Sequence, residues 1–158
     1  VWYVSHDGQR KQVDEGLQFP NGVICSPDQT QLFVTDSRNA MGYVYQIQDD
    51  GALAHKQPYI HFHCPDAKGD CSADGMTVDT LGNVYVATEL GVQVSDPLGR
   101  INWIIPKPRS AFMANVALVG PKRDWLVVTC GEQVYRRKVQ VTGSFPWEAP
   151  THPPKPGL

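Results

Sequence analysis

The sequence lacks the features that mark several large classes of protein. No apolar run approaches the ~18 residues of a membrane-spanning helix, so we expect no association of that kind with a membrane. The 14 Lys and Arg residues are balanced by 16 Asp and Glu residues, which leaves a net charge of −2 and no basic footprint for nucleic acid. Four cysteines in 158 residues are too few for a disulfide framework.

Two further patterns are missing, and what replaces them indicates strands. No stretch longer than about ten residues carries the apolar stripe of an amphipathic helix. No Gly-x-Ser-x-Gly motif is present to support a Ser-His-Asp hydrolase. The chain instead has short β-branched and aromatic runs bounded by turn formers, as at Leu32–Val34, Val84–Ala87 and Leu126–Val128. We therefore predict an all-β fold.

The short runs form a repeat. In each unit a polar residue opens a first strand, and a second strand begins about ten residues later. The openers are Asn21, Asp74 and Asn115. A third strand follows in every unit, and four short strands in roughly 40–50 residues is the period of a β-propeller blade. A β-sandwich also has regularly spaced turns, but the opener recurs in register with the strands after it, which favours propeller blades of four antiparallel strands.

The repeat divides the chain into parts of a propeller. The predicted parts are the end of an incomplete blade (1–18), a blade (19–64), a second blade (65–108), a partial blade (109–142) and a Pro-rich tail (143–158). These strands are too few for a closed ring, and the pattern is already running at Val1, so we expect a portion of a larger propeller. Its open strand edges predict self-association or pairing with a missing N-terminal half.

The openers also predict a site. In a propeller the first strand of each blade lines the central channel, so Asn21, Asp74 and Asn115 would converge there from three consecutive units. Two amides and one carboxylate make an oxygen-rich site that suits a hard cation such as Ca²⁺. The alternative is that Asn21-Gly22 and Asp74-Gly75 only form turns.

Three segment pairs resemble the regucalcin/gluconolactonase family. They are Phe19–Asp28 with Leu32–Ser37, Ala73–Asp79 with Gly82–Ala87, and Ala114–Gly120 with Leu126–Cys130. They are similar to the family's Pro-Asn-Gly, Pro-Asp-Gly and Thr-Asn-Val-Ala-Phe motifs, although Ala73 stands where the family often has Pro. The resemblance covers roughly residues 19–142 and implies about half of a six-bladed propeller, its C-terminal half.

The resemblance implies a metal-dependent lactone hydrolase. Family members bind one divalent metal, for which Ca²⁺ is preferred here and Zn²⁺ is the alternative, and they hydrolyse lactones. Asn21 matches a metal ligand, Asp74 matches a metal ligand and the proposed general base, and Asn115 matches a residue near the metal that we expect to bind substrate. The family's remaining ligand, a Glu, and its substrate-contacting Arg and Asn belong to the N-terminal half, which we expect to precede Val1.

A loop and the tail leave alternatives open. His61, His63, Cys64 and Cys71 could form a zinc cluster, but their spacing matches no structural zinc motif, so we prefer a loop that leads into a blade. Cys64 and Cys71 could instead pair if the compartment were oxidising. The Pro-rich tail should be extended, and its aromatic residues would either pack along the propeller edge or hang free. These aromatic residues are Phe145 and Trp147.

Two functions from different classes are compatible with the sequence. One is a gluconolactonase-like hydrolase that acts on a small-molecule lactone. The other is a non-catalytic propeller fragment that serves as a binding or assembly module. The identity of the lactone, the native metal and the compartment, cytoplasmic or periplasmic, are left open.

Overall fold

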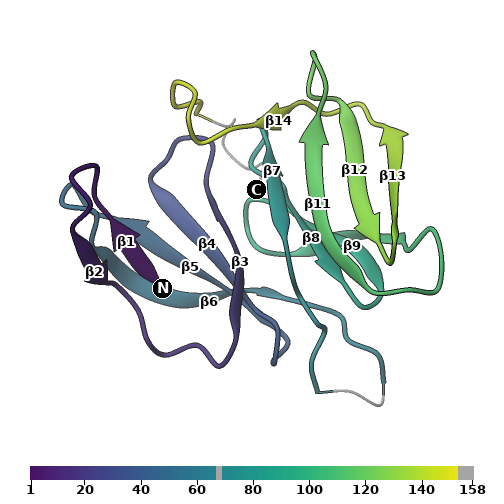
Figure 1. The fold of residues 1–158 in the computed structure, drawn as a ribbon, viewed down its shortest axis with the longest axis horizontal. Helices are drawn as coiled ribbons and strands as arrows, with labels where there is room; N and C mark the ends of the chain where they lie inside the picture. The colour runs from purple at the N-terminus through teal and green to yellow at the C-terminus, as the bar shows by residue number, and fades with distance from the viewer. Residues whose placement is uncertain (67–68, 153–158) are drawn as a thin grey trace.

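The computed structural model describes residues 1–66 and 69–152, and every regular element in them is a β-strand (Figure 1). The strands are β1 (Trp2–Val4), β2 (Arg10–Gln12), β3 (Pro20–Cys25), β4 (Gln31–Asp36), β5 (Met41–Ile47), β6 (Leu53–His61), β7 (Met76–Asp79), β8 (Val84–Thr88), β9 (Gly91–Ser95), β10 (Ile101–Pro106), β11 (Met113–Val119), β12 (Trp125–Cys130), β13 (Gln133–Lys138) and β14 (Gly143–Ser144). The structure places no membrane-spanning apolar helix in these residues. The predicted all-β class is confirmed.

The strands form antiparallel sheets that lie next to one another (Figure 1). The first large sheet has the order β3-β4-β5-β6, and the middle sheet continues the same pattern with β7-β8-β9-β10. A third sheet contains β11, β12 and β13, and β1 pairs with β2. Four-stranded antiparallel meanders are the blades of a propeller, so the architecture is the predicted one. The residue boundaries drawn between blades stay a prediction.

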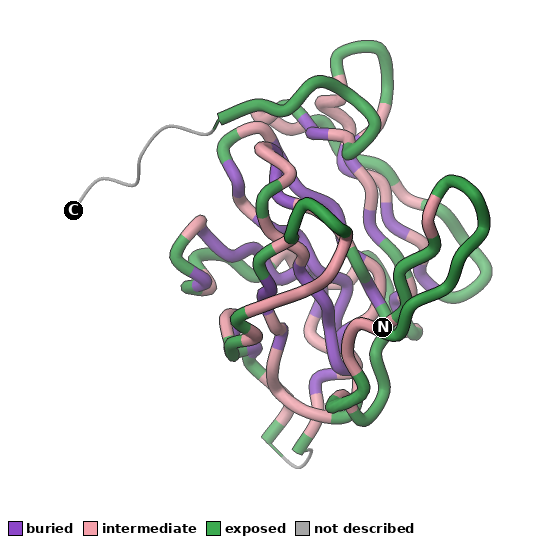
Figure 2. Tube along the Cα trace, turned by 90° about the vertical axis from the view of Figure 1, so that its left-hand side faces the viewer, coloured by how far each residue is buried: buried purple, intermediate pink, exposed green. Residues whose placement is uncertain are grey.

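Strands β7, β8 and β9 of the middle sheet are buried on both faces. On β8, Val84 and Val86 are 0% exposed and belong to the core shared with the first sheet, while Tyr85 and Ala87 belong to the core shared with the third. Successive side chains of a strand point to opposite faces, so a strand covered on both sides carries no polar alternation. Figure 2 shows buried segments inside the stack and exposed ones along its loops.

Buried aspartates end the strands of the middle sheet and start its turns. The carboxylate of Asp79 accepts the backbone N–H groups of Leu81 and Asn83, each at 2.9 Å. Asp96 accepts the N–H of Leu98 at 2.9 Å in the following turn. Because a side chain satisfies the N–H groups that a sheet would otherwise pair, the chain can leave the ladder and reverse.

The tail leaves the third sheet and runs back across the other two. Its residues 143–144 form β14, which pairs with the C-terminal half of β7. Further on, the N–H of Thr151 donates to the carbonyl of Pro27 at 2.8 Å. The Phe145 and Trp147 rings stack on each other with their centroids 4.6 Å apart, and Trp147 is 76% exposed. Backbone hydrogen bonds at residues 143–144 and 151 therefore hold the tail, while the Trp147 ring lies largely in solvent. Residues 153–158 of the predicted tail lie outside the described part.

Two glycines allow neighbouring inner strands to approach closely. A Cβ atom on Gly22 would lie 2.3 Å from the carbonyl oxygen of Asp74, and one on Gly75 would lie 2.1 Å from Oδ1 of Asn115. Neither glycine has a left-handed backbone, and Asn21-Gly22 lies inside β3. The turn alternative is therefore wrong for Asn21-Gly22, where glycine is needed for space.

Replacing Gly22 by alanine should weaken the contact between the first two large sheets. The new methyl group would collide with a backbone oxygen that cannot rotate away, so we expect Gly22→Ala to lower the free energy of unfolding by about 1–3 kcal/mol. Urea unfolding measures this loss. The matched control is Gly69→Ala, because a Cβ there meets nothing within 4 Å. Equal stability of the two variants would contradict the close-packing account.

Candidate metal-binding and catalytic site

The three predicted site residues lie at the starts of neighbouring inner strands. Asn21 is in β3, Asp74 is two residues before β7, and Asn115 is in β11. The segments touch, because Gly22 packs against the backbone of Asp74 and Gly75 packs against the side chain of Asn115. The structure therefore brings the three residues together from three consecutive blades. Their roles as metal ligands, general base and substrate contact stay predictions.

The backbone around Asp74 is held from both sides. The N–H of Asp74 donates to the carbonyl of Ala87 at 2.9 Å, and the N–H of Gly75 donates to the carbonyl of Ala114 at 3.0 Å. From the first sheet, the hydroxyl of Thr35 donates to the carbonyl of Asp74 at 3.1 Å. The carboxylate therefore starts from a fixed backbone position, as a precise site requires.

Burial sets the electrostatics of the Asp74 carboxylate. Desolvation raises the pKa of Asp74 above its usual value, while hydrogen bonds from the Gly75 backbone and the Asn21 side chain lower it in part. The ion pairs found among residues 1–66 and 69–152 do not include Asp74. Asp74 is thus a half-buried acid whose charge is stabilised by dipoles and not by a side-chain cation of the described residues.

Asn21 makes its contacts through the nitrogen of its amide. Nδ2 donates to the hydroxyl oxygen of Ser37 at 3.1 Å, and the same side chain hydrogen-bonds to Asp74. Ser37 and Thr35 were not among the predicted site residues. The sequence offers one signal for them, because Thr35-Asp36-Ser37 places polar residues at the end of a strand that begins with apolar ones.

The side-chain oxygen of Asn115 already accepts a hydrogen bond from the neighbouring backbone. Oδ1 accepts the N–H of Val116 at 2.8 Å and rests on Gly75, where a Cβ atom would not fit. The oxygen is therefore used in shaping the start of β11. Its NH₂ group is left to donate to an acceptor at the site, which suits the predicted contact with a substrate oxygen better than a metal ligand role.

The donor set fits a hard divalent cation in its chemistry. Carboxylate and amide oxygens are the ligands that Ca²⁺ prefers, and Ca²⁺ takes 6–8 of them. Asp74 supplies a half-buried carboxylate, which a cation would stabilise in its charged form, and Asn21 supplies an amide oxygen. The described residues bring no group of three or more His, Cys, Asp or Glu side chains into metal-binding range. Two such donors would fill only part of a coordination shell.

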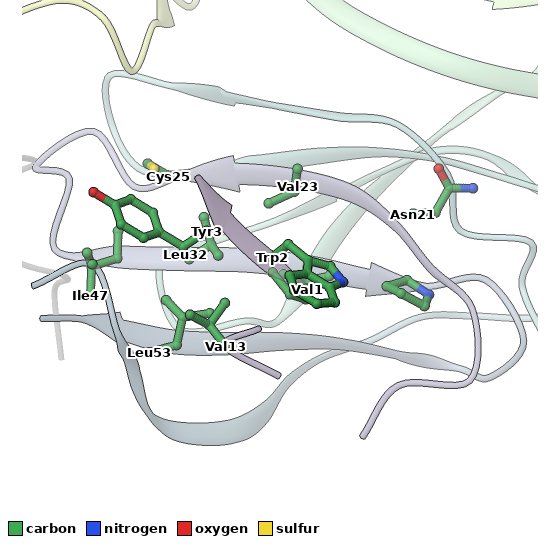
Figure 3. Close-up of a pocket in the computed structure, with 13 residues that line it drawn as sticks. Val1, Trp2, Tyr3, Val13, Asn21, Val23, Cys25, Leu32, Ile47 and Leu53 are labelled. Carbon is green, nitrogen blue, oxygen red and sulfur yellow. The ribbon is translucent and has the colours of Figure 1, made fainter. Parts of the chain in front are cut away.

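A mostly apolar pocket lies beside Asn21. It is enclosed between the β1–β2 hairpin and the face of the first large sheet, and Trp2, Val23 and Leu53 are among the side chains that line it. Figure 3 shows Asn21 at one end, apart from the group of apolar side chains. Trp2 is 63% exposed and Val23 is 56% exposed. The sequence analysis did not predict this pocket, because its walls come from strands that are distant in the chain.

The zinc alternative for the loop after β6 does not hold. Cys64 and Cys71 form a disulfide in the structure, with their Cα atoms 4.6 Å apart. Oxidised sulfurs cannot act as thiolate ligands. The loop leads from β6 towards Asp74 as expected, and the backbone of His63 is anchored by the buried side chain of Gln93 at 2.9 and 2.7 Å.

The chain belongs to a family described as the SMP-30/gluconolactonase/LRE-like region. The model of that family matches residues 1–132, which is most of the chain. The predicted resemblance to the regucalcin/gluconolactonase family is therefore confirmed. A lactone hydrolase is the class of enzyme that this family assignment supports.

Individual relatives agree with the family and show how much of it is covered. The chain is 26% identical over 147 residues to a gluconolactonase of Zymomonas mobilis, spanning 90% of this chain and 41% of the relative. It is 28% identical over 130 residues to the pentonolactonase XacC of Haloferax volcanii, spanning 78% and 42%. The solved structure of a calcium-binding protein, regucalcin, from Agrobacterium tumefaciens has the same fold, with a TM-score of 0.77, 20% identity and coverage of 91% and 53%. The chain thus spans less than half the length of the two lactonases and about half that of the regucalcin structure.

Neutralising the Asp74 side chain should stabilise the metal-free chain more at neutral pH than in acid. Because burial raises the pKa of Asp74 in the folded state, the unfolded chain releases this proton first, and stability falls as pH rises. Asp74→Asn removes that effect. We expect its gain in unfolding free energy over the wild type to grow between pH 3 and pH 6 (about the range in which an Asp titrates), as measured by urea unfolding. A gain that shrank with rising pH would contradict the sign of the shift.

Proposed function

We propose that this chain carries part of the active site of a metal-dependent lactone hydrolase, with Asn21 and Asp74 as metal ligands and Asp74 as the general base. The observation that carries the proposal is the convergence of these residues from adjacent blades around a half-buried carboxylate. The names of the lactonase relatives support lactones as the substrate class. Ca²⁺ is the preferred ion, since the donors are oxygens and one solved relative is a calcium-binding protein.

The side chains have separate tasks in this proposal. A bound divalent cation would supply Lewis-acid polarisation of the lactone carbonyl. Asp74 accepts the proton of the water that attacks this carbonyl, and burial brings its pKa closer to neutrality than that of a solvated Asp, which suits a general base. The NH₂ group of Asn115 donates to an oxygen of the lactone. Water attack opens the ring and gives the hydroxy acid.

The base role predicts a loss of turnover without loss of fold. In the protein that hydrolyses lactones, including any segments that complete the propeller, Asp74→Asn should lower kcat at least 100-fold, in line with the usual contribution of general bases. Asp49→Asn is the matched control, since Asp49 is an exposed turn residue away from the site. The assay follows acid release from gluconolactone. Near-normal turnover of Asp74→Asn with Ca²⁺ present would refute the base role.

The ligand role predicts that Ca²⁺ stabilises the protein. A ligand that binds only the folded state raises the unfolding free energy by RT ln(1 + [L]/Kd), so saturating Ca²⁺ should raise the melting temperature and a chelator should reverse the shift. Asn21→Ala should reduce the shift, because it removes one oxygen donor. A melting temperature that is the same with Ca²⁺ and with chelator would count against a metal site.

A second function, a non-catalytic binding or assembly module, rests on a different observation. The β1–β2 hairpin exposes Trp2 and Val4 at 63% and 57% beside the apolar pocket. The first large sheet has a fourth strand, β6, at its outer edge. In the third sheet, no fourth strand of the described residues pairs with β13. A second copy of the chain, or the rest of the propeller, would cover these surfaces. Sedimentation velocity at micromolar concentrations distinguishes a self-associated chain from a monomer.

A further inference from the structure

Two hydroxyl groups at the end of β4 face the candidate site. Thr35 lies in β4 and Ser37 is the first residue after it, and both hydroxyls reach the segment that precedes β7, at the carbonyls of Asp74 and Ala73. Asp36 lies between them and points the other way, where its carboxylate accepts the N–H groups of Gln18 and Phe19 at 2.8 and 2.9 Å. The strand thus presents an acid to one neighbour and two hydroxyls to the site.

The Ser37 hydroxyl can donate its single hydrogen to only one of its two neighbours. Oγ of Ser37 lies 2.5 Å from the carbonyl oxygen of Ala73, and a carbonyl can only accept. The hydroxyl hydrogen is therefore used in that bond. Towards Asn21, at 3.1 Å, the same oxygen can only accept, so the atom of Asn21 that faces it must be the NH₂ nitrogen.

This constraint decides how the whole amide of Asn21 is oriented. One N–H of Nδ2 is used in the hydrogen bond to Ser37. The oxygen Oδ1 is on the opposite side of the planar group and remains available as an acceptor. If the amide rotated by half a turn, Oδ1 would face the lone pairs of the Ser37 hydroxyl, which repel it.

Thr35 has a different task from Ser37. Its Oγ1 accepts the N–H of Gly22 at 2.8 Å and donates to the carbonyl of Asp74 at 3.1 Å, and the residue is 0% exposed. Thr35 thus fastens backbone to backbone. The hydroxyl of Ser37 instead links the backbone carbonyl of Ala73 to the side chain of Asn21.

We propose that Ser37 is a positioning residue of the site, which holds the Asn21 amide with its oxygen presented to a ligand. The inference rests on the proposed function, because the ligand for that oxygen is the divalent cation. It goes further by assigning a task to a residue outside the ligand set. Outer partners of metal ligands typically change metal affinity about 10–100-fold when they are removed.

The test follows the Asn21 side-chain NH₂ signals of the ¹⁵N-labelled 158-residue chain without metal. Asn21→Ala identifies the pair by its disappearance. In Ser37→Ala we expect these protons to exchange with water about tenfold faster, because the hydrogen bond to Oγ is lost. Ser37→Thr, which keeps the hydroxyl, should restore slow exchange. The matched control is Ser110→Ala, a change at an exposed serine outside the site.

Calcium titration by calorimetry then separates this inference from the proposed function. We expect Ser37→Ala to bind Ca²⁺ about 10–100-fold more weakly than the wild type, and Ser37→Thr to recover most of the affinity. Altered exchange in Ser37→Ala without Ca²⁺ binding by any variant would support the positioning role while refuting the metal site. Unchanged exchange of the Asn21 protons would overturn the positioning role. If the alanine variant does not fold, Ser37→Cys offers a weak acceptor of similar size for the same test.

Discussion

The close approach of successive inner strands is the contact on which the site depends. The missing side chain of Gly22 leaves room for the carbonyl of Asp74, and that of Gly75 leaves room for the side chain of Asn115. The start of each inner strand therefore contacts the start of the next one. Without this approach the three polar residues would be farther apart than one small ligand can bridge. The middle sheet is covered on both sides over β7, β8 and β9, and every residue of these three strands is buried.

Much of this could be predicted from the sequence, because a repeat signals both local and long-range structure. The period of four short strands predicts blades, and the recurrence of Asn21, Asp74 and Asn115 predicts where they meet. Contacts made through the backbone could not be predicted in the same way. Asn-Gly is typical of turns, and only the carbonyl of a distant residue explains why glycine stands inside β3. The strand β14 is equally hidden, since Gly-Ser has no preference for a strand.

The candidate site combines stiffness with an energetic cost. Asp74 is anchored through its own N–H and carbonyl, yet its carboxylate is half-buried with dipoles for neighbours. Folding therefore proceeds against the desolvation of this group, while a cation or a proton would relieve it. A carboxylate in these surroundings would gain by binding a cation or a proton, and the backbone that carries it is fixed on both sides. Under the proposed function, the role of Asp74 would therefore come at a cost in stability.

The contacts of the tail also bear on the order in which the parts of the chain fold. The side chain of Gln29 donates to the carbonyl of Glu148 across 119 positions of sequence, and Thr151 reaches Pro27 in the same way. Contacts between segments so distant in the chain form late, since the entropy of closing the loop must be overcome first. During synthesis, the turn between β3 and β4 therefore lacks these two hydrogen bonds until residues 148 and 151 have been made.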